Sequence, residues 1–568
     1  MYDTAGRRRL IEVAAGRVPA DLVLKNAVYF NVFTATYEQG DLALCDGIIA
    51  GIGQYSGLRE ISVPGLRVLP GFIDAHIHLE SALVAPSAFA AAVLPHGTTT
   101  VVTDPHEIAN VLGADGIRYM LEATEGLPLD VRFMLPSCVP ATPWDEAGAV
   151  LEADDLTPLL AHPRVIGLAE LMNFVGTVQG DEAVLQKLEL VAAHGRRVDG
   201  HAPGLSGAAL NAYIAAGVHS DHECTTLAEA REKLRRGQFI MLRDGTAAHN
   251  LQALWPLLCG PGSERCLLCT DDKHPSDLLE KGHMDYLLRT ALALGSDEAR
   301  TIQAATYNAA QYFGLHDRGA IAPGRRADLV LVDDTSHVQQ VYRDGVLRYE
   351  ASTGIAAFTP PCVSPTLSAR AHDTMHCAPL TAADFTDEAP RPVIGLVPGE
   401  LITESPGDAS AIDPARDILR LAVVERRHRT GHIGLCYLHG YGLRRGAVAT
   451  SVAHDSHNLI VAGASAKAMA LAAERVRLMG GGIVVADEND ILAEVPLSIA
   501  GLMSDAPLPE VNQALEAAKA AARALGCQAG IDPFMTLSFL SLPVIPTLRL
   551  TTRGAFDVNT QTLYDAQG

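Results

Sequence analysis

The most informative stretch of this sequence reads Pro70-Gly71-Phe72-Ile73-Asp74-Ala75-His76-Ile77-His78-Leu79-Glu80. It is an apolar run that ends in two histidines separated by one residue. In a β-strand, residues two apart project from the same face, so the imidazoles of His76 and His78 can reach one point in space and bind one metal ion. An isolated pair of this kind is more often two hydrogen-bonded histidines at a strand end, so the residues downstream must decide between the two interpretations.

Short runs of β-branched or apolar residues recur after this segment, and several end in a residue that can bind a divalent cation. The further predicted strands span residues 98–103, 131–135, 164–169, 197–200, 217–221, 238–243 and 265–270. Segments rich in Ala, Leu and Glu, such as 210–216 and 226–235, separate them and favour helices. Eight strands alternating with helices, from about residue 71 to about 320, predict an α/β fold with a TIM-type (β/α)8 barrel, whose catalytic groups lie at the C-terminal ends of the strands.

Six side chains that can bind metal would then meet at one mouth of this barrel. They are His76, His78, Glu170, His201, His222 and Asp271. Imidazole and carboxylate ligands without thiolates suit Zn²⁺, Mn²⁺ or Fe²⁺ and do not discriminate sharply among them. The register leaves two positions open, because Asp272 could replace Asp271 and His219 could replace His222.

Five sequence blocks at these strand ends resemble a known family. They read TDPHEIAN at 103–110, AELMNF at 169–174, GHAP at 200–203, HECTT at 222–226 and CTDD at 269–272. With the His-x-His pair, they resemble the amidohydrolase superfamily of binuclear metal hydrolases and, within it, the bacterial adenine deaminases. The resemblance extends from Arg8 to near the C-terminus.

The resemblance implies a hydrolase that holds two divalent metal ions. The expected ligand sets are His76, His78 and Asp271 for one ion and His201 with His222 for the other, bridged by Glu170. Other members of the superfamily use a carbamylated lysine as this bridge. A water molecule held between the ions loses a proton near neutral pH and becomes the nucleophile, with Asp271 as the proton shuttle.

The reaction implied by the resemblance is the hydrolytic deamination of adenine to hypoxanthine and ammonia, in purine salvage. Attack at C6 and protonation of N1 precede the loss of ammonia. Glu223 and His106 are further catalytic candidates, and Asp104 and Glu107 are candidates for contacting the purine. Two of these have simpler interpretations: Glu223 could be a carboxylate at a helix N-terminus, and Asp104 before a proline could be only a turn or cap.

Two other functions compete with this one. A related amidohydrolase that acts on a cyclic amide or on another aminated heterocycle would use the same ligands, because fold and metal are shared across many substrates. A non-catalytic barrel that serves as a binding scaffold is disfavoured, because six metal-binding side chains are costly to gather without a function. The pair Cys266 and Cys269 is not a further metal site, since residues three apart on a strand face opposite sides.

Composition and charge narrow the class of partner. A chain of 568 residues is too long for one hydrophobic core, and its formal net charge of −22 works against binding a nucleic acid. Arg7-Arg8-Arg9 is not followed by the apolar core of a signal peptide, and no apolar stretch could span a bilayer. The ten cysteines show no disulfide framework. We therefore expect a cytoplasmic enzyme. Its expected partners are a purine base and a second copy of the chain in a homodimer, with no nucleic acid and no membrane.

Short segments on the two sides of the barrel resemble each other. ADLVL at 20–24 returns at 327–331, and the Asp-Gly pair at 46–47 returns at 344–345, where it favours hairpin turns. We therefore predict one small β-sandwich formed by residues 1–69 and 321–375, beside a barrel over 70–320. The family resemblance implies the same arrangement.

A further unit is predicted over residues 380–568, after a proline-rich break at 360–365. It has strands at 418–424, 446–452 and 459–462 and a helix at 465–479, which predict an additional C-terminal α+β domain. This unit is rich in histidine, but most such histidines, here His428 and His439, are surface or hydrogen-bonded groups. His454 and His457 could instead form a second metal site or a lid over the barrel.

Overall fold

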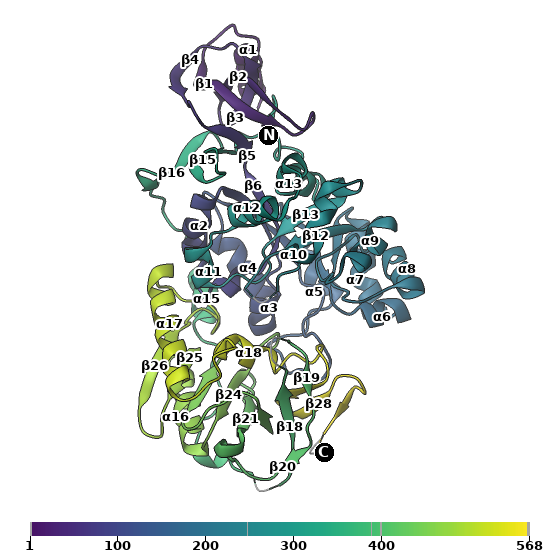
Figure 1. Cartoon of the computed structure of the whole chain (residues 1–568), viewed down its shortest axis with the longest axis vertical. Coiled ribbons are helices and arrows are strands. Elements are labelled where there is room, and N and C mark those ends of the chain that lie inside the picture. Colours follow the sequence, from purple (N-terminus) through teal and green to yellow (C-terminus); the bar gives the residue numbers. More distant parts are fainter. Residues whose placement is uncertain (1–2, 247, 388, 398–399, 565–568) are drawn as a thin grey trace.

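The structure is a computed structural model that describes residues 3–246, 248–387, 389–397 and 400–564. Residues 1–2 and 565–568, the outer ends of the first and last predicted units, lie outside this range. Figure 1 shows three parts along the longest axis of the molecule. A sheet built from both flanks lies at one end, alternating strands and helices lie in the middle, and the C-terminal unit lies at the other end.

The eight strands predicted for the central part all form. They are β6 (Phe72–Ile77), β7 (Thr98–Thr103), β8 (Asp130–Leu135), β9 (Val165–Leu171), β10 (Arg197–Gly200), β11 (Ser220–Asp221), β12 (Phe239–Arg243) and β13 (Cys266–Cys269). Five of them form a parallel sheet in the order β10-β9-β8-β7-β6, and three form a second one in the order β11-β12-β13. The α/β alternation expected from the sequence is therefore present.

Backbone hydrogen bonds join the two sheets at both edges. The amide of Asp271 donates to the carbonyl of His76 at 2.9 Å, next to a bridge between Ile77 and Asp271. On the other side, the amide of His219 donates to the carbonyl of Val198 at 3.0 Å. These bonds bring the C-terminal ends of β6 and β13 together, which places the first and last predicted metal ligands side by side.

The strand predicted at 217–221 is shorter than expected. It begins at Ser220, and Gly217 has a φ of +102°, which belongs to the turn after helix α8 (Gly207–Ala215). Glycine adopts this backbone conformation without the steric cost that a side chain would add. The helix expected at 226–235 is confirmed as α9 (Leu227–Arg235), which Thr226 caps.

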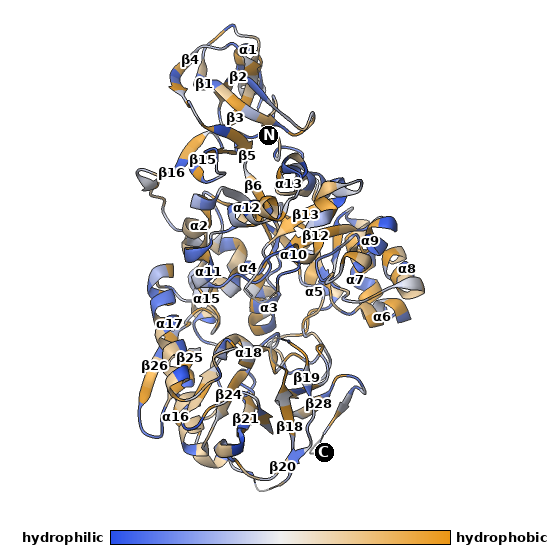
Figure 2. Ribbon diagram, in the orientation of Figure 1, coloured by the Kyte–Doolittle hydropathy of each residue, from blue (hydrophilic) through white to orange (hydrophobic). Residues whose placement is uncertain are grey.

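The strands bury their inner faces against one another. One cluster of buried apolar residues takes members from six strands, among them Ile73, Met134, Met241 and Cys269. Cys266 packs in a different cluster, so the two cysteines of the C-x-x-C pair face opposite sides of β13 as expected. Figure 2 shows β12 and β13 as largely hydrophobic, which is typical of strands covered on both faces.

Strands from both flanks form one sheet of nine strands. Its order is β17-β16-β15-β14-β5-β1-β2-β3, and β4 pairs with β1. The strands are β1 (Ala20–Asn31), β2 (Thr36–Cys45), β3 (Ile48–Gly53), β4 (Gly57–Ser62), β5 (Arg67–Pro70), β14 (Leu329–Val332), β15 (Val338–Arg343), β16 (Val346–Glu350) and β17 (Gly354–Ile355). The predicted hairpin turns are both present, with positive φ at Asp46, Gly47, Asp344 and Gly345. A Cβ at Gly47 would lie 2.9 Å from the Asp344 carbonyl oxygen, so this turn needs glycine.

The C-terminal unit is built on a second sheet of nine strands. Its order is β19-β18-β22-β21-β24-β23-β25-β26, and β20 pairs with β18. The strands are β18 (Arg391–Leu396), β19 (Thr403–Glu404), β20 (Asp408–Ala409), β21 (Ile418–Val424), β22 (Ile433–His439), β23 (Ala447–Thr450), β24 (Leu459–Gly463), β25 (Gly482–Ala486) and β26 (Ile491–Pro496). The unit also contains helices α16 (Ala466–Leu478), α17 (Leu508–Ala524) and α18 (Pro533–Phe539). A small antiparallel sheet follows them, formed by β27 (Leu548–Thr551), β28 (Gly554–Asp557) and β29 (Thr562–Leu563).

Successive residues of β21, in the middle of this sheet, pack into two different apolar clusters on opposite faces of the sheet. Leu419, Leu421 and Val423 on β21 belong to an apolar cluster that continues into the helices of the middle part. Ala422 and Val424 face the opposite side, which α16 covers. The shared cluster fixes the C-terminal unit against the middle part of the molecule.

Candidate metal centre and active site

The six predicted metal ligands converge at the C-terminal ends of the parallel strands. His76 is on β6, Glu170 is on β9, and His201 follows β10 directly. Their neighbours in the site are His78, His222 and Asp271. Five of the six are buried, and His201 is half-buried.

Glu170 lies between two pairs of histidines. Its Oε1 is 3.3 Å from Nε2 of His78 and 3.8 Å from Nε2 of His76. Its Oε2 is 2.7 Å from Nδ1 of His201 and 3.3 Å from Nε2 of His222. The two carboxylate oxygens therefore face separate pairs of candidate ligands, an arrangement that suits a carboxylate bridging two ions.

Asp271, and not Asp272, faces the first pair of histidines. Its Oδ1 is 3.5 Å from Nε2 of His76 and 3.2 Å from Nε2 of His78. The backbone at Asp271 has a φ of +60°, which turns the chain as it leaves β13. Asp272 points elsewhere and accepts a hydrogen bond from the hydroxyl of Ser81.

The structure also distinguishes His222 from His219, the second position that the sequence left open. His222 is buried within the cluster and stacks on His76 with ring centroids 4.3 Å apart. His219 lies three residues earlier, at the base of β11, and its amide serves the backbone bond to Val198. The geometry therefore places His222 with the other candidate ligands.

A divalent metal ion fits this group of side chains. The buried Nε2 of His76 has no hydrogen-bond partner among the described residues. A buried polar atom without a partner is rare in a native structure, and a bound ion would supply what is missing. The imidazole and carboxylate ligands are those that Zn²⁺, Mn²⁺ and Fe²⁺ accept.

Arg243 is a member of the site that the sequence analysis missed. Its guanidinium, at the end of β12, donates to both carboxylate oxygens of Glu223, at 2.9 Å for the Nη2 contact, and also contacts Asp271. Burial favours the neutral acid, but the Arg243 charge outweighs it and holds the pKa of Glu223 below its usual range. The strand-end rule could have found Arg243, but arginine is not a metal ligand.

Glu223 does not lie at a helix N-terminus, so that simpler interpretation is wrong. Helix α9 begins at Leu227, and the acidic residue in its first turn is Glu229. Glu223 lies instead 3.3 Å from Nε2 of His222, through its Oε1. The carboxylate therefore sits beside the second pair of histidines with Arg243 behind it.

His106 extends the cluster away from Glu170. Its Nδ1 lies 3.0 Å from Oδ2 of Asp104 and 3.5 Å from Oε1 of Glu170. Helix α3 (His106–Leu112) has Pro105 at its N-cap and no side-chain cap, so Asp104 is not the capping residue that its position allowed. The carboxylate of Asp104 instead contacts the imidazole of His106.

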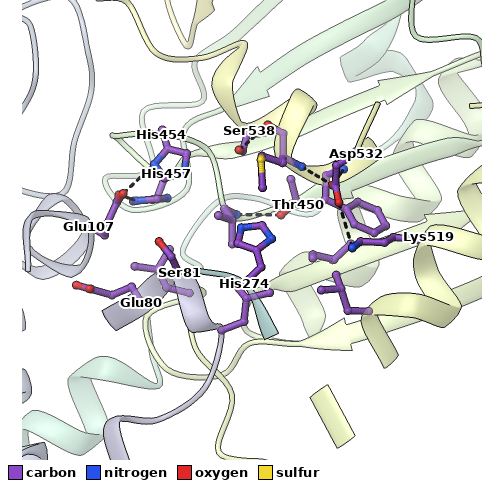
Figure 3. A pocket seen from close by; sticks show the side chains of 17 residues that line it. Glu80, Ser81, Glu107, His274, Thr450, His454, His457, Lys519, Asp532 and Ser538 are labelled. Atoms are coloured by element: carbon purple, nitrogen blue, oxygen red, sulfur yellow. Dashed lines mark hydrogen bonds and ion pairs between the residues drawn. The ribbon is translucent and has the colours of Figure 1, made fainter. Parts of the chain in front are cut away.

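Glu107 faces the C-terminal unit, although the sequence analysis placed it among candidates for contacting the purine. Its Oε1 lies 2.8 Å from Nδ1 of His454, and its Oε2 contacts Nε2 of His457. Figure 3 shows these two imidazoles pointing toward Glu107 at one side of a pocket that Ser81 and His274 also line. Both carboxylate oxygens of Glu107 therefore contact histidines of the C-terminal unit.

The tautomer of His457 argues against a second metal site at this cluster. Its Nδ1 accepts a hydrogen bond from the backbone amide of Ala453 at 3.1 Å. A neutral imidazole that accepts at Nδ1 carries its proton at Nε2, so it donates to Glu107 and offers no lone pair there to an ion. His428, expected to be a hydrogen-bonded group, lies 2.9 Å from the Ala147 carbonyl through its Nε2.

A pocket lies between loops of the middle part and the C-terminal unit. Its apolar lining includes Leu83, Val452, Ile483, Leu502, Leu515 and Phe534. The Glu107 cluster closes one part of it, and the ion pair of Lys519 with Asp532, 3.1 Å apart, lies at another, as Figure 3 shows. The C-terminal unit therefore supplies much of the wall of this pocket.

No helix among the described residues is both long and apolar enough to cross a bilayer. All ten cysteines are free thiols.

Comparison with known proteins identifies the family. Residues 67–358 match the model of the amidohydrolase family, and residues 399–562 match that of the adenine deaminase C-terminal domain. The chain is 48% identical to an adenine deaminase of Cereibacter sphaeroides and 47% identical to adenine deaminase 2 of Carboxydothermus hydrogenoformans. Each alignment covers 97% of this chain and 98% of the relative.

A third relative, an adenine deaminase of Desulfatibacillum aliphaticivorans, is 46% identical over the same shares of the two chains. Similarity at this level extends along almost the whole length of both chains in each alignment. The chain therefore belongs to the adenine deaminase family of amidohydrolases.

Proposed function

We propose that this protein converts adenine to hypoxanthine and ammonia at a binuclear metal centre bridged by Glu170. The deamination of adenine by a metal-dependent hydrolase follows from the full-length similarity to adenine deaminases. The binuclear arrangement is our inference from one observation, the two oxygens of Glu170 that face separate pairs of histidines.

The proposed ligands divide between the two sides of Glu170. His76, His78 and Asp271 hold one divalent ion, and His201 with His222 holds the other. Divalent ions in these positions lower the pKa of a water molecule and so supply the nucleophile for C6 of adenine. We propose Mn²⁺, Fe²⁺ or Zn²⁺, because the ligand set accepts all three.

Other side chains of the site accept protons, keep the carboxylates ionised or contact the substrate. Asp271 accepts the proton of the attacking water through Oδ1, which faces His76 and His78. Arg243 keeps Glu223 and Asp271 ionised and fixes their orientation. We assign His106, which lies 3.0 Å from Asp104, to contact with the purine ring.

Several wider assignments belong to the same proposal. The hydrogen bonds that join the two parallel sheets at both edges support a closed (β/α)8 barrel over residues 70–320. We divide the rest into a composite β-sandwich over 1–69 and 321–375 and a C-terminal domain over 380–568. A role in purine salvage, a cytoplasmic location and a homodimer stay predictions.

The binuclear proposal is tested by metal content and turnover together. Elemental analysis should give two ions per chain of active protein, and Glu170→Gln should weaken the binding of both, because the amide offers one neutral donor oxygen. Glu182→Gln, on the exposed face of helix α7 (Glu182–Ala193), is the matched control. One tightly held ion, unchanged in Glu170→Gln, would exclude the proposal. Hydrolysis of cyclic amides without turnover of adenine would favour the alternative amidohydrolase.

A further inference from the structure

A buried carboxylate without a partner lies on the C-terminal unit above the candidate metal centre. Asp455 is 3% exposed, and its Oδ2 has no hydrogen-bond partner among the described residues. The nearest cationic groups to Oδ1 are Nε2 of His106 and Nδ1 of His454, each 3.9 Å away and beyond hydrogen-bonding distance. The carboxyl of Asp145 is buried close enough for the charge of Asp455 to act on it, and its Oδ2 also has no hydrogen-bond partner among the described residues. A buried carboxylate without a donor is costly, and a ligand that carries a hydrogen-bond donor would complete Asp455.

The loop that carries Asp455 is held firmly in place. It connects β23 to β24, and the amide of His454 donates to the Ser538 carbonyl at 3.1 Å. At its other end, the side-chain amide of Asn458 donates to the Glu146 carbonyl at 3.0 Å, and Arg427 donates to the His457 carbonyl at 3.0 Å. These bonds fix the direction of the Asp455 carboxylate, as required of a group that recognises a ligand.

One imidazole ring connects this carboxylate to the metal centre. Nδ1 of His106 faces Glu170 at 3.5 Å, and its Nε2 faces Asp455. A purine bound with C6 at the metal centre and its ring beside His106 would extend toward Asp455. The edge of a purine farthest from C6 carries N9, which in the free base bears a hydrogen.

We propose that Asp455 is a specificity-determining residue that accepts a hydrogen bond from the ring N–H of the free purine base. The inference rests on the proposed function, with adenine C6 at the binuclear centre. A carboxylate accepts this bond but cannot donate one, so it selects bases that carry a ring N–H. A nucleoside, whose N9 bears a sugar, lacks the donor and leaves Asp455 buried without a partner.

The test compares adenine with 9-methyladenine, which has no ring N–H. Asp455→Ala should raise KM for adenine by about tenfold to a hundredfold, the usual range for a lost hydrogen bond to a charged group, and change kcat much less. The affinity for 9-methyladenine, measured as a substrate or as a competitive inhibitor, should stay unchanged. Asp490→Ala, on an exposed turn of the same unit, should alter neither value.

Three controls keep the outcomes distinct. Metal content and melting temperature establish that Asp455→Ala is folded and loaded; if it does not fold, Asp455→Asn should show a smaller rise in KM for adenine alone. An unchanged KM for adenine, or an equal loss of affinity for both compounds, would overturn the role of Asp455. Failure of the native, metal-loaded protein to deaminate adenine would instead overturn the proposed function.

Discussion

Glu107 and His457 form a buried hydrogen bond although 350 residues separate them in the sequence. Glu107 lies on a helix that follows the second barrel strand, and His457 lies on a loop of the C-terminal unit. The bond therefore ties the two parts of the molecule together beside the candidate active site. Both partners are buried. The bond should therefore contribute to stability, because a buried acceptor that loses its donor is left unsatisfied.

His457→Leu should therefore destabilise the protein. The substitution removes the donor to Glu107 and leaves the Ala453 amide without its acceptor, at a cost of roughly 2–4 kcal/mol. Thermal or urea unfolding measures the change. His439→Leu removes an exposed histidine from the end of β22 and serves as the control. Equal stability of the two variants would show that the Glu107 contact contributes little.

Asp271→Asn and Asp272→Asn should show which of the two neighbouring aspartates accepts the proton of the attacking water. The amide at 271 cannot accept the proton of the attacking water, so activity should fall by about two orders of magnitude or more while much of the metal is retained. Asp272, which is bonded to Ser81, should be far less sensitive. Metal content and adenine turnover are measured on both variants. A dead Asp272→Asn enzyme beside an active Asp271→Asn enzyme would move the proposed proton shuttle by one residue.

Arg243→Met should shift the acid limb of the pH–activity profile to higher pH. The native guanidinium opposes the effect of burial and lowers the pKa of Glu223 and of Asp271. Without it both carboxyls take up protons at higher pH, so kcat/KM should fall more at pH 5 than at pH 8. Arg243→Lys, which keeps the charge, should shift less, and Arg236→Met on the surface should not shift at all. A uniform loss at all pH values would contradict this electrostatic role.

Asp145→Asn should stabilise the protein, and more so at high pH. Burial, together with the charge of Asp455, raises the pKa of Asp145 to about 8. Between roughly pH 4 and pH 8 the unfolded chain loses this proton while the folded one keeps it, so native stability falls as pH rises. The neutral asparagine lacks this dependence. The difference in unfolding free energy should grow from near zero at pH 4 to a few kcal/mol above pH 8.

Urea unfolding at several pH values measures this difference. Asp334→Asn, at an exposed position, should give a difference that does not vary with pH. A stability gain for Asp145→Asn that is constant from pH 4 to pH 9 would mean that Asp145 is ionised in the native protein.

The side chains that meet at the candidate metal centre could be predicted from local signals, except that only the family resemblance favoured Asp271 over Asp272 and His222 over His219. The spacing of His76 and His78 follows from the two-residue repeat of a strand, and the others follow strands whose pattern is equally regular. The hairpin turns at Asp46 and Asp344 were predictable for the same reason, since Asp-Gly favours positive φ at both positions. These features need no knowledge of how distant parts pack.

Arg243 and Asp455 could not be assigned in this way. Arg243 acts by pairing with carboxylates on two other strand ends, and this depends on the order of strands in the sheet. Asp455 reaches the site only because an apolar core shared by the barrel helices and the C-terminal sheet docks the two parts. Contacts of this kind are set by tertiary packing and leave no periodic pattern in the sequence.

The position of β5 between β1 and β14 has a consequence for biosynthesis. During translation β1 to β5 emerge from the ribosome first, and one edge of β5 has no partner until residues 329–332 have been made. The whole barrel segment is synthesised within that interval. An open strand edge is a template for incorrect pairing, so a nascent chain that stalls inside the barrel segment exposes an aggregation-prone edge that the finished protein covers.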